Sequence, residues 1–320
     1  MTTEFAPLNP TSTTTTRRLQ FRAYGGPEVL ELAEVPLPQP DRGQVRVRVR
    51  AAGINGRDSK MRAGLFEPGA TAPAVAGTVG IEMAGVIDAV GADVTEWTVG
   101  QPVFGRTAAF DAVAGHALAP VGDIVAKPDS LGFVQAAALP VATEAAYRTL
   151  RQLDVRDGQT LLVHAAAGGV GLMAVQLARL RGATVVGTAS EANHDFLRDI
   201  GAIPVTYGDG LVERIRSAAP QGIDAVLDGS GRGVLPLSIA LTGDPAKVIT
   251  IADLGAAQYG VRFSTEIVPI PEAMAEHLTL FESGRLRMPI EAVFPLEEAA
   301  DAYRRLDAGH LRGKIVVAVA

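Results

Sequence analysis

The chain has 320 residues, of which 48% are hydrophobic and 20% are charged, a balance typical of a folded globular protein. The net charge of −6 offers no basic face for nucleic acid, and no apolar run is long enough to span a bilayer, so neither is expected as a partner. The absence of cysteine excludes disulfides, thiolate zinc sites and a cysteine nucleophile. Because no signal pattern begins the chain, we expect a cytoplasmic protein.

The first part of the chain has a sequence pattern typical of a β domain. Residues 1–16 are polar and low in complexity, which predicts a disordered tail. Residues 44–50 alternate as QVRVRVR, so valines share one face and arginines the other, as in a half-buried strand. Short apolar runs punctuated by Gly and Pro continue to residue 139 and predict a mostly antiparallel sheet or partial barrel over 17–139.

From residue 140 to 268 the texture changes to alternating strands and helices. TLLVHA, GVGLMAVQLARLRG and ATVVGTAS read as strand, helix and strand, and the rhythm continues to about residue 254. This alternation predicts an α/β domain, a doubly wound parallel Rossmann sheet with helices on both faces. Two further helical segments, 271–284 and 296–309, and a final strand, KIVVAVA, complete 269–320 and are expected to return to the first domain.

Glycines gather where the strand TLLVHA meets the following helix. Gly168, Gly169 and Gly171 leave the backbone bare at a helix start, whose free N–H groups suit a diphosphate. The usual G-x-G-x-x-G spacing is not met, because Ala166 holds the first position. Close helix–strand packing would also explain the glycines, but the flanking elements favour dinucleotide binding by this loop, in which Ala167 and Val170 take part.

The end of the second strand bears on which dinucleotide is bound. NAD sites carry a carboxylate there, whereas this strand ends at residues 188–190 without one. Ser190 and Asn193 offer donors to a 2′-phosphate, and Tyr207 is placed to close over it. NADPH (NADP+) is therefore the expected cofactor, although Glu191 argues mildly against it and strictness over NADH stays open.

Four segments carry a family resemblance: AAAGGVGLMAVQLARLRGA, AAGINGRDSKMRAGLF, GIEMAGVIDAVGADVTEWTVG and PLEEAADAYRRLDAGHLRGKIVV. Together they resemble the medium-chain dehydrogenase/reductase superfamily, and within it the zinc-less quinone oxidoreductase and enoyl-reductase branch. The resemblance runs over about 19–319. It implies a discontinuous GroES-like catalytic domain (17–139 and 269–320) around an NADP(H)-binding domain (140–268), with the active site in the cleft. Family habit also implies a homodimer through an edge strand near 261–264.

The resemblance also bears on metal. Zinc-dependent relatives have a ligand Cys where this chain has Asn55, and a His before the glutamate where Ile81 precedes Glu82. Asn55 and Ile81 do not bind zinc, so no metal site is expected. Without a metal, no Lewis acid is available to ionise an alcohol substrate. The expected small-molecule substrate is then already polarised: a quinone, an enone or an enoyl thioester, with the proton taken from solvent.

Two residues are the candidates for catalysis, Lys60 and Asn55. Many relatives have tyrosine where Lys60 stands, and the resemblance implies that the ammonium stabilises an enolate oxygen or holds the nicotinamide ribose. The plain alternative is a solvated charge at a strand end. Asn55 is expected to contact nicotinamide or substrate, or else to be only a turn residue, and Glu82 is expected to be structural.

The remaining expected cofactor contacts are Thr143, Ser230, Ala252 and Lys314. Thr143 is equally good as a helix N-cap, and Ser230 and Ala252 as ordinary loop residues after strands. Lys314 is expected near the nicotinamide, and His164 is expected to be a packed histidine.

These features favour an NADPH-dependent, zinc-independent reductase of quinones or activated C=C bonds. A non-catalytic NADPH-binding protein and a repurposed biosynthetic enzyme on the same fold remain alternatives.

Overall fold

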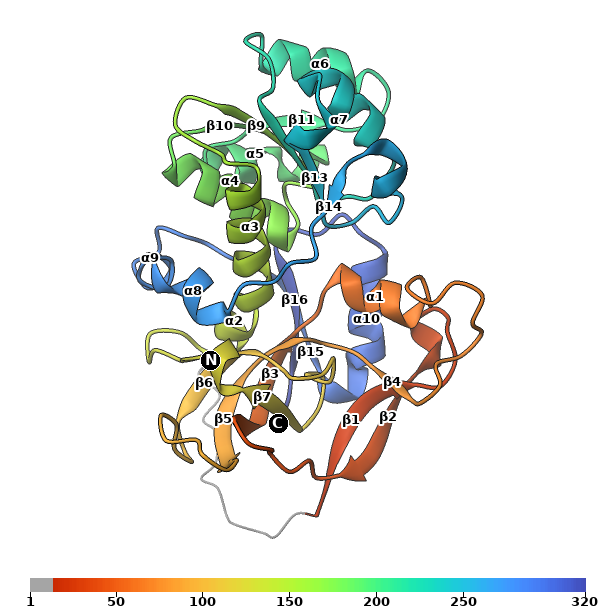
Figure 1. Cartoon of the computed structure of the whole chain (residues 1–320), viewed down its shortest axis with the longest axis vertical. Helices are drawn as coiled ribbons and strands as arrows, with labels where there is room; N and C mark the ends of the chain where they lie inside the picture. Colours follow the sequence, from red (N-terminus) through yellow and green to blue (C-terminus); the bar gives the residue numbers. More distant parts are fainter. Residues whose placement is uncertain (1–13) are drawn as a thin grey trace.

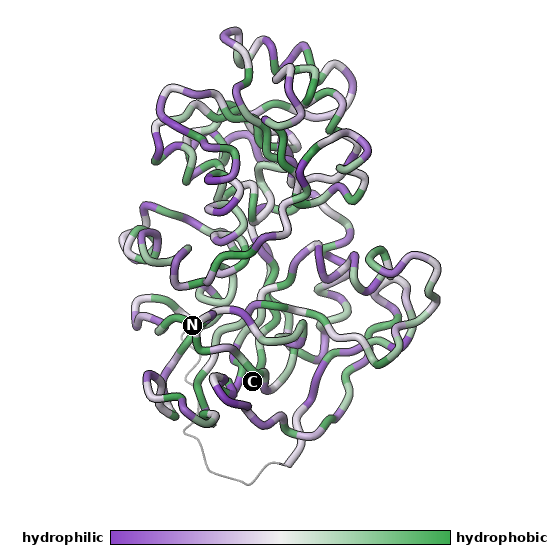
Figure 2. The backbone as a smooth tube through the Cα atoms, viewed as in Figure 1, coloured by the Kyte–Doolittle hydropathy of each residue, from purple (hydrophilic) through white to green (hydrophobic). Residues whose placement is uncertain are grey.

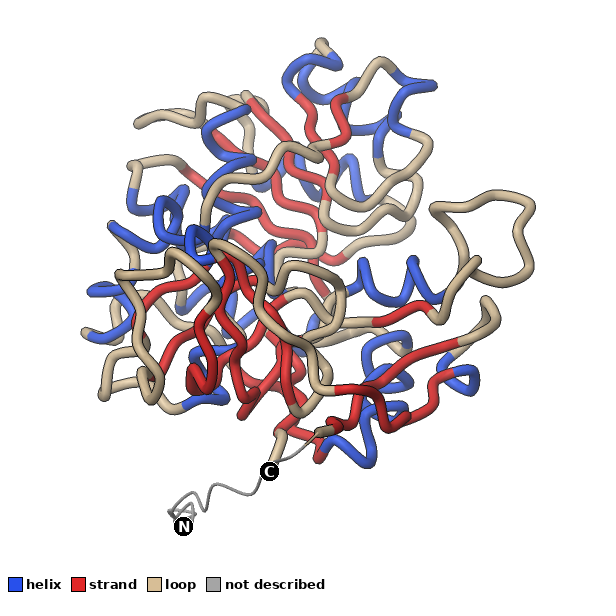
Figure 3. Tube along the Cα trace, turned by 60° about the horizontal axis from the view of Figure 1, so that its bottom comes forward, coloured by secondary structure: helices blue, strands red, loops and turns tan. Residues whose placement is uncertain are grey.

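The structure, a computed structural model, describes residues 14–320. A parallel sheet flanked by helices forms one half of the molecule, and a mainly antiparallel arrangement of strands forms the other (Figure 1). The same division is visible after rotation, with helices on both sides of the upper strands (Figure 3). The predicted fold class, a Rossmann sheet with a GroES-like β domain, is confirmed.

The GroES-like half contains two sheets. The larger has, in spatial order, β15 (Ile290–Pro295), β16 (Lys314–Ala318), β3 (Gln44–Gly53), β5 (Glu82–Val90), β6 (Pro102–Arg106) and β8 (Ile124–Ala126), with β7 (His116–Pro120) paired to β3. The smaller has β2 (Leu30–Pro36), β1 (Thr15–Phe21) and β4 (Gly77–Thr78). The helices of this half are α1 (Gly56–Arg62), α2 (Phe133–Ala137) and α10 (Ala299–Asp307).

The alternation in β3 determines which face is buried. Val45, Val47 and Val49 are at most 1% exposed and belong to the core of this half, as the QVRVRVR pattern predicts. The predicted tail needs a correction at its end, because Thr15 and Thr16 already pair with β2. The rest of that tail, residues 1–13, lies outside the described residues.

The Rossmann half is one six-stranded parallel sheet. Its order is β11 (Ile203–Thr206), β10 (Thr184–Ala189), β9 (Thr160–His164), β12 (Ala225–Asp228), β13 (Val248–Thr250) and β14 (Arg262–Phe263). Its helices are α3 (Pro140–Gln152), α4 (Gly169–Leu180), α5 (His194–Asp199), α6 (Leu211–Ala218) and α7 (Leu235–Thr242). Short 3-10 turns complete the chain at 27–29, 121–123, 191–193, 245–247, 256–259 and 296–298.

Strand β9 shows why this sheet needs helices on both faces. Leu161 and Val163 point to the core under α3 and α4, whereas Leu162 points to a second core under α6 and α7. A strand that is apolar on both faces is buried only if both are covered. The hydropathy tube accordingly places its most hydrophobic stretches at the centre of this half (Figure 2).

The C-terminal segments differ from expectation in detail. The predicted helix over 271–284 is two short helices, α8 (Ile270–Ala275) and α9 (Leu278–Glu282). The helix is interrupted where the His277 amide bonds back three residues to the Met274 carbonyl rather than four. Helix α8 packs against α3, while β15 and β16 join the larger sheet of the GroES-like half. The boundaries at 139/140 and 268/269 stay a prediction. Among the described residues, no helix combines the length and apolarity that crossing a membrane requires.

Candidate active site

The glycine loop lies between β9 and α4, at the carboxyl edge of the parallel sheet. Gly168 is the N-cap of α4, and no side-chain hydrogen bond caps the helix start within the described part of the chain. The Gly168 amide turns back to the Ala165 carbonyl, 3.1 Å away. Ala165 itself has φ +59°, which a residue with a Cβ rarely adopts. The chain thus makes a tight turn that presents the next amides and the positive end of the helix dipole outward.

The glycines of this loop have different structural reasons. A Cβ at Gly171 would lie 2.3 Å from the Ala165 carbonyl oxygen, and one at Gly169 would lie 2.7 Å from Lys314 Cδ. Both are therefore required by packing inside the protein. A Cβ at Gly168 would meet nothing nearer than 3.5 Å, so the protein alone does not demand glycine there. Gly168 is the position at which a ligand's close approach best explains the absence of a side chain.

Ala166, which breaks the usual glycine spacing, is accommodated by the neighbouring strand. A Cβ at Gly187 in β10 would lie 2.7 Å from the Ala166 methyl group. The methyl group at 166 thus occupies space that the glycine at 187 leaves free.

The expected 2′-phosphate residues gather at the ends of β10 and β11. The Asn193 amide donates to Ser190 Oγ at 3.3 Å, so these two side chains lie together, and their contact with a 2′-phosphate stays a prediction. Tyr207 is 45% exposed, and its hydroxyl lies 2.9 Å from His310 Nδ1. His310 belongs to the loop before β16, so the GroES-like half contacts this end of the parallel sheet.

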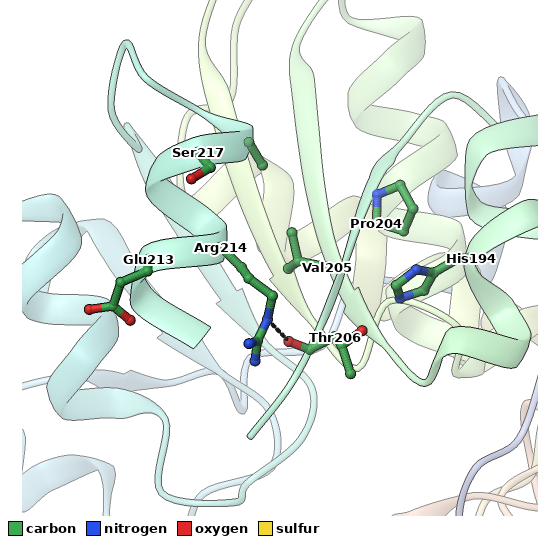
Figure 4. Close-up of a pocket in the computed structure, with 8 residues that line it drawn as sticks. His194, Pro204, Val205, Thr206, Glu213, Arg214 and Ser217 are labelled. Carbon is green, nitrogen blue, oxygen red and sulfur yellow. Dashed lines mark hydrogen bonds between the residues drawn. The ribbon is translucent and has the colours of Figure 1, made fainter. Parts of the chain in front are cut away.

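Arg214 supplies a cation at this end that the sequence reading missed. Its Nε donates to the Thr206 carbonyl at 2.9 Å, and its Nη2 lies 3.3 Å from the carbonyls of Tyr207 and Gly208. It therefore fixes the turn that carries Tyr207. Arg214 and His194 line a pocket of about 460 Å³ beside the edge strand β11 (Figure 4). His194 Nε2 is buried there with no hydrogen-bond partner among residues 14–320.

Lys60 reaches from the GroES-like half to the carboxyl edge of the parallel sheet. Its ammonium donates to the carbonyl oxygen of Ala252, which follows β13. Burial lowers the pKa of this ammonium, and neighbouring Arg57 acts in the same direction, against Asp228 and Asp253. The alternative of a strand-end charge is wrong, because Lys60 lies in helix α1 and is half-buried at the junction of the two halves.

Asn55 is held in a buried polar network and not left free. Its amide donates to Glu82 Oε1 at 2.9 Å and its oxygen accepts from Lys314 Nζ at 2.7 Å. Glu82 is fully buried, and its second oxygen accepts from the Val141 amide at 2.8 Å, where α3 begins. The expectation that Glu82 is structural fits this arrangement. Asn55 is also the N-cap of α1, as a turn residue would be. Its predicted contact with nicotinamide or substrate is compatible with that position and stays a prediction.

Lys314, expected near the nicotinamide, uses its ammonium within the protein, and its contact with the cofactor stays a prediction. Lys314 is 4% exposed, and its three N–H donors are directed to Ile54 O, Asn55 Oδ1 and Glu82 Oε1 at 2.6–2.9 Å. The aliphatic stem passes Gly169, and Gly313 bonds to the Ala167 carbonyl at 2.8 Å. Lys314 thus packs against the glycine loop, and all three donors of its ammonium are used within the protein.

The other three residues expected to contact the cofactor, Thr143, Ser230 and Ala252, differ in their surroundings. Thr143 is not an N-cap, because α3 begins at Pro140 and the Thr143 amide already bonds to the Leu139 carbonyl. Its hydroxyl is fully buried without a partner among the described residues, which leaves a donor for a ligand. Ser230 donates its hydroxyl to Asp228 at 2.7 Å, and the Ala252 carbonyl accepts from Lys60. Cofactor contacts of these three residues stay predictions.

His164 is a packed histidine, as expected. It is 1% exposed, with Ser238 Oγ 3.2 Å from Nε2 and Thr188 Oγ1 3.4 Å from Nδ1. Burial lowers its pKa to about 4, opposed by Asp228, so the ring is neutral near pH 7.

Within residues 14–320, no group of three or more His, Cys, Asp and Glu side chains is arranged to hold a metal ion. The described site instead contains the uncapped start of α4 and the ammonium of Lys60, both at the carboxyl edge of the parallel sheet. Three residues near the site were not predicted from the sequence: Arg214, His310 and Arg57. No local pattern marks them, because the contacts of each one depend on a loop or helix that is distant in the chain.

Known proteins resemble the chain over nearly its whole length. The family model for the alcohol dehydrogenase GroES-like domain matches residues 41–138, and that for zinc-binding dehydrogenases matches residues 200–317. A quinone oxidoreductase of Pseudomonas aeruginosa is 35% identical over 94% of this chain and 99% of its own. The spectinabilin polyketide synthase system protein NorB of Streptomyces orinoci is 36% identical over 92% of this chain and 14% of its own.

Solved structures agree with these relatives. The quinone oxidoreductase from Coxiella burnetii superposes with a TM-score of 0.84, at 31% identity, covering 96% of this chain and 100% of that one. The Escherichia coli quinone oxidoreductase complexed with NADPH superposes with a TM-score of 0.80, at 26% identity, covering 94% and 99%. The chain therefore belongs to the medium-chain dehydrogenase/reductase superfamily, in its quinone oxidoreductase and enoyl-reductase branch, and is an oxidoreductase.

Proposed function

We propose that the protein is an NADPH-dependent reductase of quinones or of activated C=C bonds, the latter in enones or enoyl thioesters, working by hydride transfer without zinc. The observation that carries the proposal is the meeting of two groups at one sheet edge. The uncapped start of α4 lies at the carboxyl edge of the parallel sheet, and Lys60 reaches the same edge at Ala252.

The residues present fit a reduced dinucleotide. Amides of the glycine loop bind the diphosphate, and the orphaned Thr143 hydroxyl accounts for one further donor. Ser190, Asn193 and Tyr207 receive the 2′-phosphate, with the charge of Arg214 behind them. The complex of a relative with NADPH supports the same cofactor here. When bound, the nicotinamide supplies the hydride.

Lys60 is the residue that acts on the substrate. An ammonium has three donors, and within residues 14–320 only the Ala252 carbonyl takes one of them. The remaining donors stabilise the oxyanion that forms on a quinone or enone oxygen, in surroundings dry enough to strengthen the interaction. The proton that completes the reaction comes from solvent.

The test is NADPH oxidation, followed by absorbance, with a panel of quinones, enones and enoyl thioesters in the presence of a metal chelator. We expect turnover with at least one class, and a fall in kcat/KM of about 10- to 1000-fold in Lys60→Met with little change in NADPH affinity. Lys127→Met is the matched control, because Lys127 also donates to backbone carbonyls but lies outside this site. Saturable NADPH binding without any turnover would instead favour the non-catalytic alternative.

A further inference from the structure

Arg57 is a cation held between two aromatic rings. Its guanidinium carbon lies 5.1 Å from the ring centroid of Phe66 and 5.1 Å from that of Phe110. The three residues come from α1, from the loop that follows it, and from the loop after β6. Two ring faces at this distance attract and orient a guanidinium without neutralising it.

The charge of Arg57 is not balanced by an acidic partner. No carboxylate of the described residues forms an ion pair with it, although fifteen such pairs occur elsewhere in that part of the chain. Its side chain is exposed, and no side chain or carbonyl of the described residues forms a hydrogen bond or ion pair with its guanidinium. The five N–H donors of the guanidinium are therefore available to an external acceptor.

Arg57 also lies beside the proposed reaction site. It precedes Lys60 by three residues, and positions i and i+3 of a helix are neighbours on one face. The two cations are close enough that Arg57 contributes to the lowered pKa of Lys60. Lys60 also has acidic neighbours, Asp228 and Asp253, which act on its pKa in the opposite direction.

We propose that Arg57, with Phe66 and Phe110, selects a substrate that carries a carboxylate or another anionic group at a distance from its reducible bond. The rings receive the flat, apolar body of the molecule, and the guanidinium pairs with its acidic group while Lys60 holds the carbonyl oxygen. This inference rests on the proposed reductase function and names its substrate class: acidic, unsaturated carbonyl compounds. Phe66 is 39% exposed, which leaves ring area for such a contact.

The test compares benzylideneacetone with its para-carboxy derivative. Binding of each enone is first measured by calorimetry on the full chain saturated with NADP+, where no hydride is transferred. We expect the carboxylated enone to bind at least about tenfold more tightly, and Arg57→Gln to abolish that difference while changing the affinity for the neutral enone less than about twofold. The difference should also shrink as salt is raised, because an exposed pair is screened.

Arg42→Gln is the matched control, since Arg42 is an exposed arginine paired with Asp93. Equal affinity for the two enones in the wild type, or an unchanged difference in Arg57→Gln, overturns the inference. Turnover with NADPH is measured separately. A difference in binding that depends on Arg57 but comes without reduction of either enone, or of any quinone, would refute the reductase function and leave the anion site standing. If Arg57→Gln lowers only the thermal midpoint, its role is to hold the two loops together and the inference fails.

Discussion

Buried charges beside the site illustrate what single residues contribute. Lys314 and Glu82 are 4% and 0% exposed and lie 2.6 Å apart. Removing one partner of such a pair leaves an uncompensated buried charge, whereas the intact pair contributes more to geometry than to stability. Here that geometry fixes Asn55 and the start of α3 at once. Asp58, fully buried one turn from Asn55, is a second carboxylate near the same lysine.

Asp58 gives a prediction about pH. Burial raises its pKa from 3.8 to about 6, against hydrogen bonds from the Asn55 amide and Tyr303 and the charge of Lys314. A raised pKa in the folded state means stability that is fully present below pH 3.8 and is lost as pH rises through 6. The free energy of unfolding of the wild type minus that of Asp58→Asn should therefore fall between pH 4 and pH 7, by at most about 3 kcal/mol.

Asp88→Asn is the control of opposite sign. Burial alone would raise the pKa of Asp88, but hydrogen bonds from His116 and Arg46 lower it below its usual value. The free energy of unfolding of the wild type minus that of Asp88→Asn should therefore rise with pH. Unfolding by urea at a series of pH values measures both, and parallel curves for the two variants would contradict the assignment.

At the scale of elements, one methyl group determines how closely the glycine loop packs against β10. Ala166, two residues after β9, lies beside Gly187 of β10, with room for one methyl group between them. The sequence predicted the strand, the loop and the helix, because their patterns are local. It gave no indication that the missing glycine at 166 is compensated by a glycine 21 residues later, since that depends on how the strands are aligned.

This contact can be tested with a double-mutant cycle. Gly187→Ala should destabilise the protein by about 1–3 kcal/mol through overpacking, seen as a lower midpoint of thermal unfolding. Adding Ala166→Gly should recover most of that loss and restore the usual glycine spacing. If the two changes are simply additive, the methyl group at 166 does not meet residue 187.

At the scale of the whole molecule, the ends of the parallel sheet bear on assembly. Its outer strands are β11 and β14. Strand β11 contains Pro204, which lacks an N–H donor and so protects that edge from pairing with another chain. Strand β14 has no proline, and Tyr259 beside it is 43% exposed. The strand expected near 261–264 is thus present, and its edge is open within the described chain.

We propose that two chains form a homodimer by pairing their β14 strands. Light scattering should give twice the 33.3 kDa of one chain. Phe263→Pro should shift the mass to that of a monomer by removing a donor from the edge, while Ile203→Pro in β11 should not. A wild-type mass of 33.3 kDa at micromolar concentration would refute the proposal.

The sequence by itself determined the two domains' fold classes, the glycine loop and the family, because hydrophobic periodicity and turn residues act over a few neighbours. It also selected Lys60, whose spacing from Asn55 matches a family pattern. Only the tertiary structure decided where long side chains end: Lys314 in a buried ion pair, Arg214 behind Tyr207, and Arg57 between two rings. The physical reason is that a lysine or arginine extends several bonds from its backbone, so its partners are set by whichever loops the fold brings within reach.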